Sequence, residues 1–217
     1  MDTRKRIIMT YLKMKQNISH RFLSIIFGSI VCGKHCARIF VETVLMLNKI
    51  MKAIALPWPS RATIRKNLPQ CLKGVTPGGD VSHISKPCGG RYSDSAIFEQ
   101  SGLVELLEAG DGVMVDKGFL IDVPYQMKKL CLIRTPFLTK KNNRKFSATE
   151  AILTASIAKA RVYVERFNQR MKVFDILGGV YPISFVPIIG EVLDVVYGTV
   201  NLSSPTIDDD KFMGSKG

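Results

Sequence analysis

The stretch Gly112-Val113-Met114-Val115-Asp116-Lys117-Gly118-Phe119 decides how this chain is expected to fold. Three apolar residues run into Asp116, and a Lys-Gly turn follows at once. This pattern is typical of a buried strand that ends at the edge of a sheet, because the turn exposes the residue at the strand's end. It therefore predicts a strand that presents the Asp116 carboxylate at a sheet edge.

A second carboxylate, Glu165, lies in the segment from Ala160 to Arg170, which reads as a helix. An Asp at a strand end and a Glu on a helix are half of a divalent-metal site for phosphodiester chemistry, since such ions take oxygen ligands. The spacing of the residues leaves a second interpretation open, in which both are ordinary surface carboxylates.

Positive charge is concentrated in the first third of the chain. The whole chain has a net charge of +13, and residues 1–73 hold 14 Lys and Arg against 2 Asp and Glu, a net of +12. A basic helical segment ahead of a nearly neutral domain indicates a polyanionic partner, most often nucleic acid. A solvated basic surface and a membrane-facing anchor are the alternatives.

Apolar residues at helical spacing predict helices over residues 18–55, with a turn at Phe27-Gly28-Ser29. This arrangement fits a helix-turn-helix, in which the second helix contacts DNA, and equally a plain helical pair. The candidate nucleic-acid contacts on the second helix are Lys34, His35 and Arg38. A second candidate group lies in a predicted loop and consists of Lys140, Lys141, Arg144 and Lys145, which are also compatible with a solvated surface.

The order of elements downstream is strand, helix, strand, and then a long helix. Leu130 to Arg134 reads as a second buried strand, and Ser147 with Glu150 forms a capping box that opens a helix to about Phe174. This order predicts two adjacent parallel strands backed by that helix. A last helix is expected over residues 186–200.

The cysteines and the apolar stretches bear on the compartment, on zinc binding and on membrane association. The five Cys have no pairing pattern, which fits a reducing compartment, and no second ligand pair follows Cys32 and Cys36 at the spacing of a zinc site. The uncharged stretch from Phe22 to Gly33 is shorter than the roughly 20 residues that span a bilayer, so we expect no membrane partner. A secreted or membrane-tethered protein led by this stretch remains the alternative.

Three segments together resemble the DDE superfamily endonucleases of Harbinger-like transposases. They are Gly89-Gly90-Arg91-Tyr92-Ser93-Asp94, Val115 to Phe119, and Val164-Glu165-Arg166 followed by Phe174-Asp175-Ile176-Leu177-Gly178-Gly179. Weaker similarity extends upstream, through a helix-turn-helix and a connector, so that most of residues 20–202 is covered.

The resemblance implies an α/β fold, a ribonuclease H-like mixed sheet flanked by helices and preceded by a small helix-turn-helix-like region. It also implies two divalent ions, Mg²⁺ or Mn²⁺, held by two Asp and one Glu, with DNA as the partner. Asp116 matches the second carboxylate and Glu165 the third, and both are expected to be catalytic and metal-binding. A separate DNA-binding partner protein and a location in the nucleus or cytoplasm are expected with this family.

The sequence departs from the family at its first carboxylate. No Asp lies between Asp2 and Asp80, and the segment that carries the family's first strand has no counterpart near Lys73. Metal binding is therefore expected to be weak, and cleavage or strand transfer on DNA impaired. Two alternatives stay open: a non-catalytic DNA-binding protein domesticated from a transposase, and a truncated gene product without function.

These inferences predict four regions along the chain. They are a basic helical region at 1–56, a connector at 57–73, an incomplete nuclease domain at 74–202 and a disordered tail at 203–217.

Overall fold

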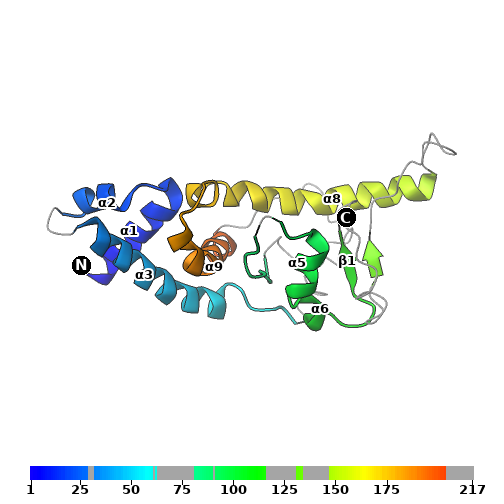
Figure 1. Cartoon of the computed structure of the whole chain (residues 1–217). Coiled ribbons are helices and arrows are strands. Elements are labelled where there is room, and N and C mark those ends of the chain that lie inside the picture. Colours follow the sequence, from blue (N-terminus) through cyan, green and yellow to red (C-terminus); the bar gives the residue numbers. More distant parts are fainter. Residues whose placement is uncertain are drawn as a thin grey trace. The chain divides into compact units, whose positions relative to one another are not determined.

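The computed structural model describes residues 1–28, 32–60, 62, 81–89, 91–115, 131–133 and 147–203 (Figure 1). The chain divides into two compact units. The first unit is Met1–Trp58 with Arg166–Pro205, and the second is Pro59–Glu165 with Thr206–Gly217. The four regions expected from the sequence stay a prediction.

The described part of the first unit is helical. Its elements are α1 (Thr3–Gln16), α2 (His20–Ile26), α3 (Gly33–Ile54), the 3-10 helices η2 (Asp175–Leu177) and η3 (Ile183–Ile188), and α9 (Ile189–Asn201). Side-chain oxygens cap the first two helices: Asp2 Oδ1 accepts from Lys5 N at 2.9 Å, and Ser19 Oγ from Phe22 N at 3.2 Å. These bonds satisfy backbone N–H groups that a helix start leaves unpaired.

One face of α3 forms the centre of this unit. Figure 1 shows α1, α2 and α3 gathered together, and Met9, Leu23, Cys36 and Ile39 form a shared buried cluster between them. The buried residues of α3 recur at intervals of three and four, so that one side of the helix is apolar and the other faces solvent.

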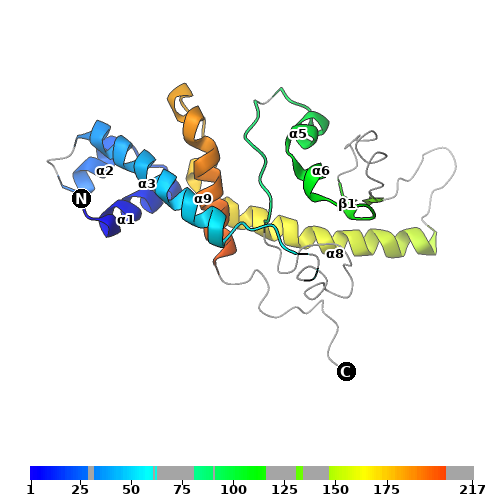
Figure 2. The ribbon, with the colours of Figure 1, turned by 90° about the horizontal axis from the view of Figure 1, so that it is seen from below.

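A second contact joins α3 to α9, which lies across the C-terminal half of α3 (Figure 2). The side chain of Met51 packs so closely on Gly198 that a Cβ added there would lie 2.8 Å from Met51 Cβ. Asp194 of α9 accepts a hydrogen bond from Asn48 Nδ2 at 2.8 Å and pairs with Lys52 Nζ at 2.9 Å. The two helices are therefore held by both close packing and a polar cluster.

By length and composition alone, Ile183–Asn201 is a helix among the described residues that could cross a membrane. Its second part, α9, buries Val192, Val195 and Val196, and its Asp194 is paired with α3. These contacts tie α9 to α3, while less than a third of the apolar segment as a whole is buried.

The second unit contains two short helices, two short strands and the first part of a long helix. They are α5 (Asp94–Gln100), α6 (Leu103–Leu106), β1 (Gly112–Met114), β2 (Cys131–Ile133) and α8 (Ala148–Met171), which crosses the boundary between the units. Ser93 caps α5 through Ala96 N at 3.3 Å. Buried Phe98 of α5 packs against Leu103, Val104, Leu107 and Val113.

The strands pair in parallel, with Gly112 opposite Cys131 and Met114 opposite Ile133. Their adjacency and direction are as the strand-helix-strand order predicts. The predicted ribonuclease H-like mixed sheet is nevertheless wrong. Across the described residues there is a single pair of three-residue strands, and most of the rest is helical.

A physical reason for this correction lies in the sequence. From the sequence, we expect the strand that the resemblance places at the centre of the sheet to be missing near Lys73. Strands become stable by sharing backbone hydrogen bonds with neighbours on both sides and by covering an apolar face, and a two-stranded pair has little of either. The expectation of a larger sheet came from the resemblance, which the missing strand undermines.

The helices are predicted more closely than the sheet. The capping box at α8 is confirmed, because Ser147 N donates to Glu150 Oε2 at 2.8 Å and Glu150 N donates to Ser147 Oγ at 3.2 Å. Helices were predicted over residues 18–55, where α2 and α3 lie, whereas α1 falls in the predicted basic helical region at 1–56 without its bounds having been predicted. The helix predicted from residue 186 begins at Ile189, since the preceding residues form the 3-10 helix that contains Pro187.

Candidate active site and nucleic-acid interface

The predicted Asp116 carboxylate follows β1 in the chain. The strand ends at Met114, Val115 is the last described residue after it, and Asp116 itself lies outside the described residues. The carboxyl ends of two parallel strands meet at one edge of a sheet, which is where α/β proteins commonly place functional groups. The structure thus supports the strand that precedes Asp116 and leaves the position of its carboxylate a prediction.

Glu165 lies on α8 and is exposed to solvent. It makes no hydrogen bond or ion pair with the part of the chain that the structure describes. Arg161, Arg166 and Arg170 lie on the same helix, and each has an interaction within the protein. Its carboxylate is therefore free to accept a ligand, but none of the described residues adds a second carboxylate to form a metal-binding group with it.

The residues that the structure describes show no set of ligands for two divalent ions. Within the described ranges there is no group of three or more His, Cys, Asp or Glu that could hold a metal. The sequence also has no Asp where the family's first carboxylate belongs. Two dications close together repel one another unless several carboxylates surround them, so Asp116 and Glu165 are too few for that task.

The candidate nucleic-acid contacts fall into two groups. Lys34, His35 and Arg38 lie in the first two turns of α3, where Lys34 and Arg38 are exposed and His35 is half-buried. The second group, from Lys140 to Lys145, lies outside the described residues. The structure therefore brings the α3 residues together and leaves the loop group untested.

A carboxylate links two arginines on this surface. Glu42 Oε2 accepts a hydrogen bond from the Arg6 guanidinium of α1 at 2.8 Å, while Glu42 Oε1 faces Arg38 Nε at 3.8 Å. Arg38 also lies 3.1 Å from His35 Nδ1. Sequence reasoning missed Glu42 and Arg6. The spacing of four between Arg38 and Glu42 is a usable signal, whereas Arg6 is brought in only by packing of α1 on α3.

Burial affects two titratable groups of the first unit, Lys13 and His20. Lys13 of α1 donates to Asn17 Oδ1 at 2.9 Å, and burial lowers the pKa of its ammonium. Burial, and next the charge of Lys13, lower the pKa of His20, whose ring packs edge-on against Phe40. His20 Nε2 is buried without a hydrogen-bond partner. In both groups burial disfavours the protonated form.

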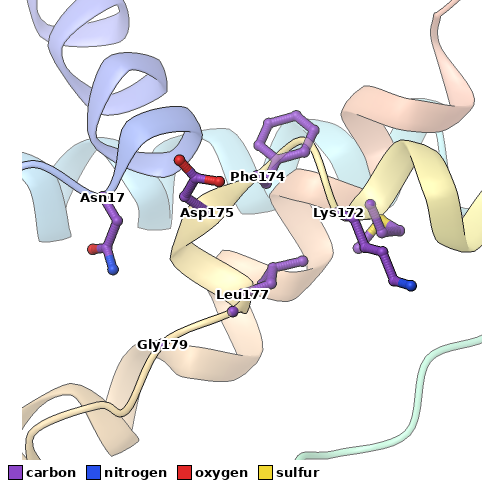
Figure 3. Close-up of a pocket in the computed structure, with 8 residues that line it drawn as sticks. Asn17, Lys172, Phe174, Asp175, Leu177 and Gly179 are labelled. Atoms are coloured by element: carbon purple, nitrogen blue, oxygen red, sulfur yellow. The ribbon is translucent and has the colours of Figure 1, made fainter.

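One pocket in the first unit lies at the end of α8. Its volume is about 500 Å³, and it is lined by Asn17, Met171, Lys172, Phe174, Asp175, Leu177, Gly178 and Gly179. Figure 3 shows the Lys172 ammonium pointing away from Asp175. Asp175 is the single carboxylate in its lining, and Glu165 does not contribute to it, so this pocket has no set of metal ligands.

A family model described as DDE superfamily endonuclease matches residues 65–201. No curated protein and no solved structure matches the chain significantly. Enzymes of this superfamily generally use divalent metal ions, and the family implies DNA as the substrate. Because the match spans more than half of the sequence, and because it covers β1, β2, α8 and α9, the chain belongs to the DDE superfamily endonuclease family.

Proposed function

We propose that this chain is a DNA-binding protein derived from a transposase, in which metal-dependent cleavage or strand transfer is impaired. The observation that supports binding is the charge of the first three helices. Residues 1–58 hold ten Lys and Arg and two Asp and Glu, a net charge of +8. One of the two acids, Asp2, caps α1, and the other, Glu42, pairs with Arg6.

Most of these cations are exposed on helices that pack into one unit. The exposed ones are Arg4, Lys5, Lys15, Arg21, Lys34, Arg38, Lys49 and Lys52. A cation that contacts a phosphate displaces a condensed counterion from DNA, and this release favours binding at low salt. A helical unit with so many exposed cations and so few acids is therefore suited to a polyanion.

The impairment of catalysis rests on the carboxylates. The family's chemistry uses three of them to hold two ions, and this sequence supplies matches for two, Asp116 and Glu165. With less negative charge the ions bind more weakly, and the alignment of the attacking and leaving oxygens is lost with them. Any bound Mg²⁺ or Mn²⁺ is thus expected to be weakly held.

Binding is tested by measuring the affinity of the full chain for a duplex of random sequence at several salt concentrations, with EDTA and with Mn²⁺. Each phosphate contact contributes roughly 0.9 to the slope of log affinity against log salt. Replacing Arg4, Lys5, Lys34 and Lys49 by Gln should weaken binding and flatten this slope, with EDTA making no difference. Replacing Lys140, Lys141, Arg144 and Lys145 by Gln is the control of equal charge, and it should have the smaller effect.

Two results would overturn the proposal. A larger effect of the control set would move the interface to the segment from Leu138 to Phe146. No salt-dependent binding by the unmodified chain, together with no cleavage, would favour a gene product without function. A requirement for a separate DNA-binding partner protein would appear as specific binding that is seen only in a nuclear or cytoplasmic extract.

The family match favours a second function, metal-dependent endonuclease activity that survives in this chain. It requires another carboxylate to replace the missing Asp. Nicking of a supercoiled plasmid in the presence of Mn²⁺ distinguishes it from the proposed function, because a DNA-binding protein without catalysis leaves the plasmid intact.

A further inference from the structure

We infer that Glu42 is a positioning residue, which together with His35 holds the Arg38 guanidinium ready to bind a phosphate of DNA. This inference rests on the proposed DNA binding and adds a residue of the opposite charge to the interface. Glu42 does not itself touch the phosphate. Its role is to fix the direction of a neighbouring cation.

The geometry holds Arg38 from two sides. Its guanidinium lies 3.1 Å from His35 Nδ1, and its Nε lies 3.8 Å from Glu42 Oε1. The Arg38 side chain is nevertheless 68% exposed. Since a guanidinium has five N–H donors, these contacts leave donors available for the two oxygens of a phosphate.

Glu42 is itself fixed by α1. Its other oxygen accepts from Arg6 at 2.8 Å, and Arg6 Nε donates to Thr43 Oγ1 at 3.4 Å. Thr43 is fully buried and donates to Ile39 O at 2.7 Å. Contacts through Arg6 thus connect the Glu42 carboxylate to buried Thr43, and the other oxygen of Glu42 faces the exposed Arg38.

Charge alone gives no reason for an acid at this position. A carboxylate that is 51% exposed among cations repels the phosphates of DNA, and exposed ion pairs contribute little to stability. A long side chain that is ordered before binding, however, loses less conformational entropy when it meets its ligand. Glu42 is therefore explained by positioning rather than by stability or by net charge.

The test is a double-mutant cycle of Glu42→Gln and Arg38→Gln, with affinity for a random-sequence duplex as the readout. If only net charge mattered, Glu42→Gln would tighten binding both in the unmodified chain and in the Arg38→Gln background. If Glu42 positions Arg38, Glu42→Gln should weaken binding roughly threefold or more in the unmodified chain. This is the effect of having to order one long side chain on binding. In the Arg38→Gln background it should no longer weaken binding.

A parallel cycle with Lys49→Gln is the control, because Lys49 is exposed on the same helix and makes no ion pair with Glu42. That cycle should be additive, and the urea midpoints of all variants should agree closely. Equal tightening by Glu42→Gln in both backgrounds would overturn this inference and leave the proposed function standing. Absence of duplex binding by the unmodified chain would overturn the proposed function itself.

Discussion

Replacing Gly198 of α9 by Ala is expected to destabilise the first unit, although Gly-to-Ala changes within helices usually raise stability. An added Cβ would lie 2.8 Å from Met51 Cβ and 3.0 Å from its Cγ and Sδ. The Cβ of Met51 is fixed to the backbone and cannot swing aside, so the overpacking cost should lie near the top of its usual range, about 1–3 kcal/mol. Ala gains at most about 1 kcal/mol of helix propensity over Gly.

The net prediction is a loss of about 1–2 kcal/mol in the free energy of unfolding, by difference between these two effects. The assay is urea denaturation of the full chain followed by circular dichroism, with Met51→Ala and the double variant completing a cycle. Gly198→Ala should cost less in the Met51→Ala background, where two of the three close atoms are gone. Stabilisation by Gly198→Ala, or a cost that is independent of Met51, would refute the close packing of α3 on α9.

Three further changes test the structure. Asp194→Ala should cost about 1–3 kcal/mol in urea denaturation because it leaves the buried Asn48 amide with only a 3.5 Å hydrogen bond to Glu191 O. Lys52→Ala, at a residue 60% exposed, should cost less than about 1 kcal/mol, and equal costs would contradict this. His20 has a folded-state pKa below its unfolded value near 6.5, so its contribution to stability is complete above that pH and is lost as the pH falls toward the folded pKa. Between pH 7.5 and 5, the urea midpoint of His20→Leu should therefore fall less than that of the unmodified chain, by about the contribution of one titrating group. If the two proteins show the same fall, the burial of His20 is contradicted. Ser147→Ala should lower stability by about 0.5–2 kcal/mol through loss of the α8 cap, and no change in the thermal midpoint would show that the cap is dispensable.

The sequence predicts local structure where a short signal has one physical meaning. Ser147 and Glu150 stand at the spacing of a capping box, and that box opens α8. The strand pair was predicted because two apolar runs flank a segment that reads as a helix, and this strand-helix-strand order favours parallel pairing. The first helix gave no such signal, since its buried residues include Thr10 and Lys13, which interrupt the apolar pattern.

The larger fold could not be predicted in the same way. The mixed sheet was inferred from the resemblance, and a fold inferred by analogy depends on each strand of the family being present, whereas we expected the central strand to be missing near Lys73. Of the candidate site, the exposed Glu165 and the α3 cations could be predicted from residue type and position. The link from Arg6 to Glu42 could not, because contacts between residues far apart in sequence depend on how α1 packs on α3.

The central claim is that a member of the DDE endonuclease family binds DNA through its first three helices and cleaves it poorly. The most direct measurement is the rate of supercoiled plasmid nicking by the full chain with Mn²⁺, beside Asp116→Ala and Glu165→Ala, at protein concentrations that saturate the plasmid. We expect all three proteins to bind the plasmid and to nick it only at the same background rate. Robust nicking by the unmodified chain, abolished by either substitution, would contradict it and would mean that another carboxylate completes the site.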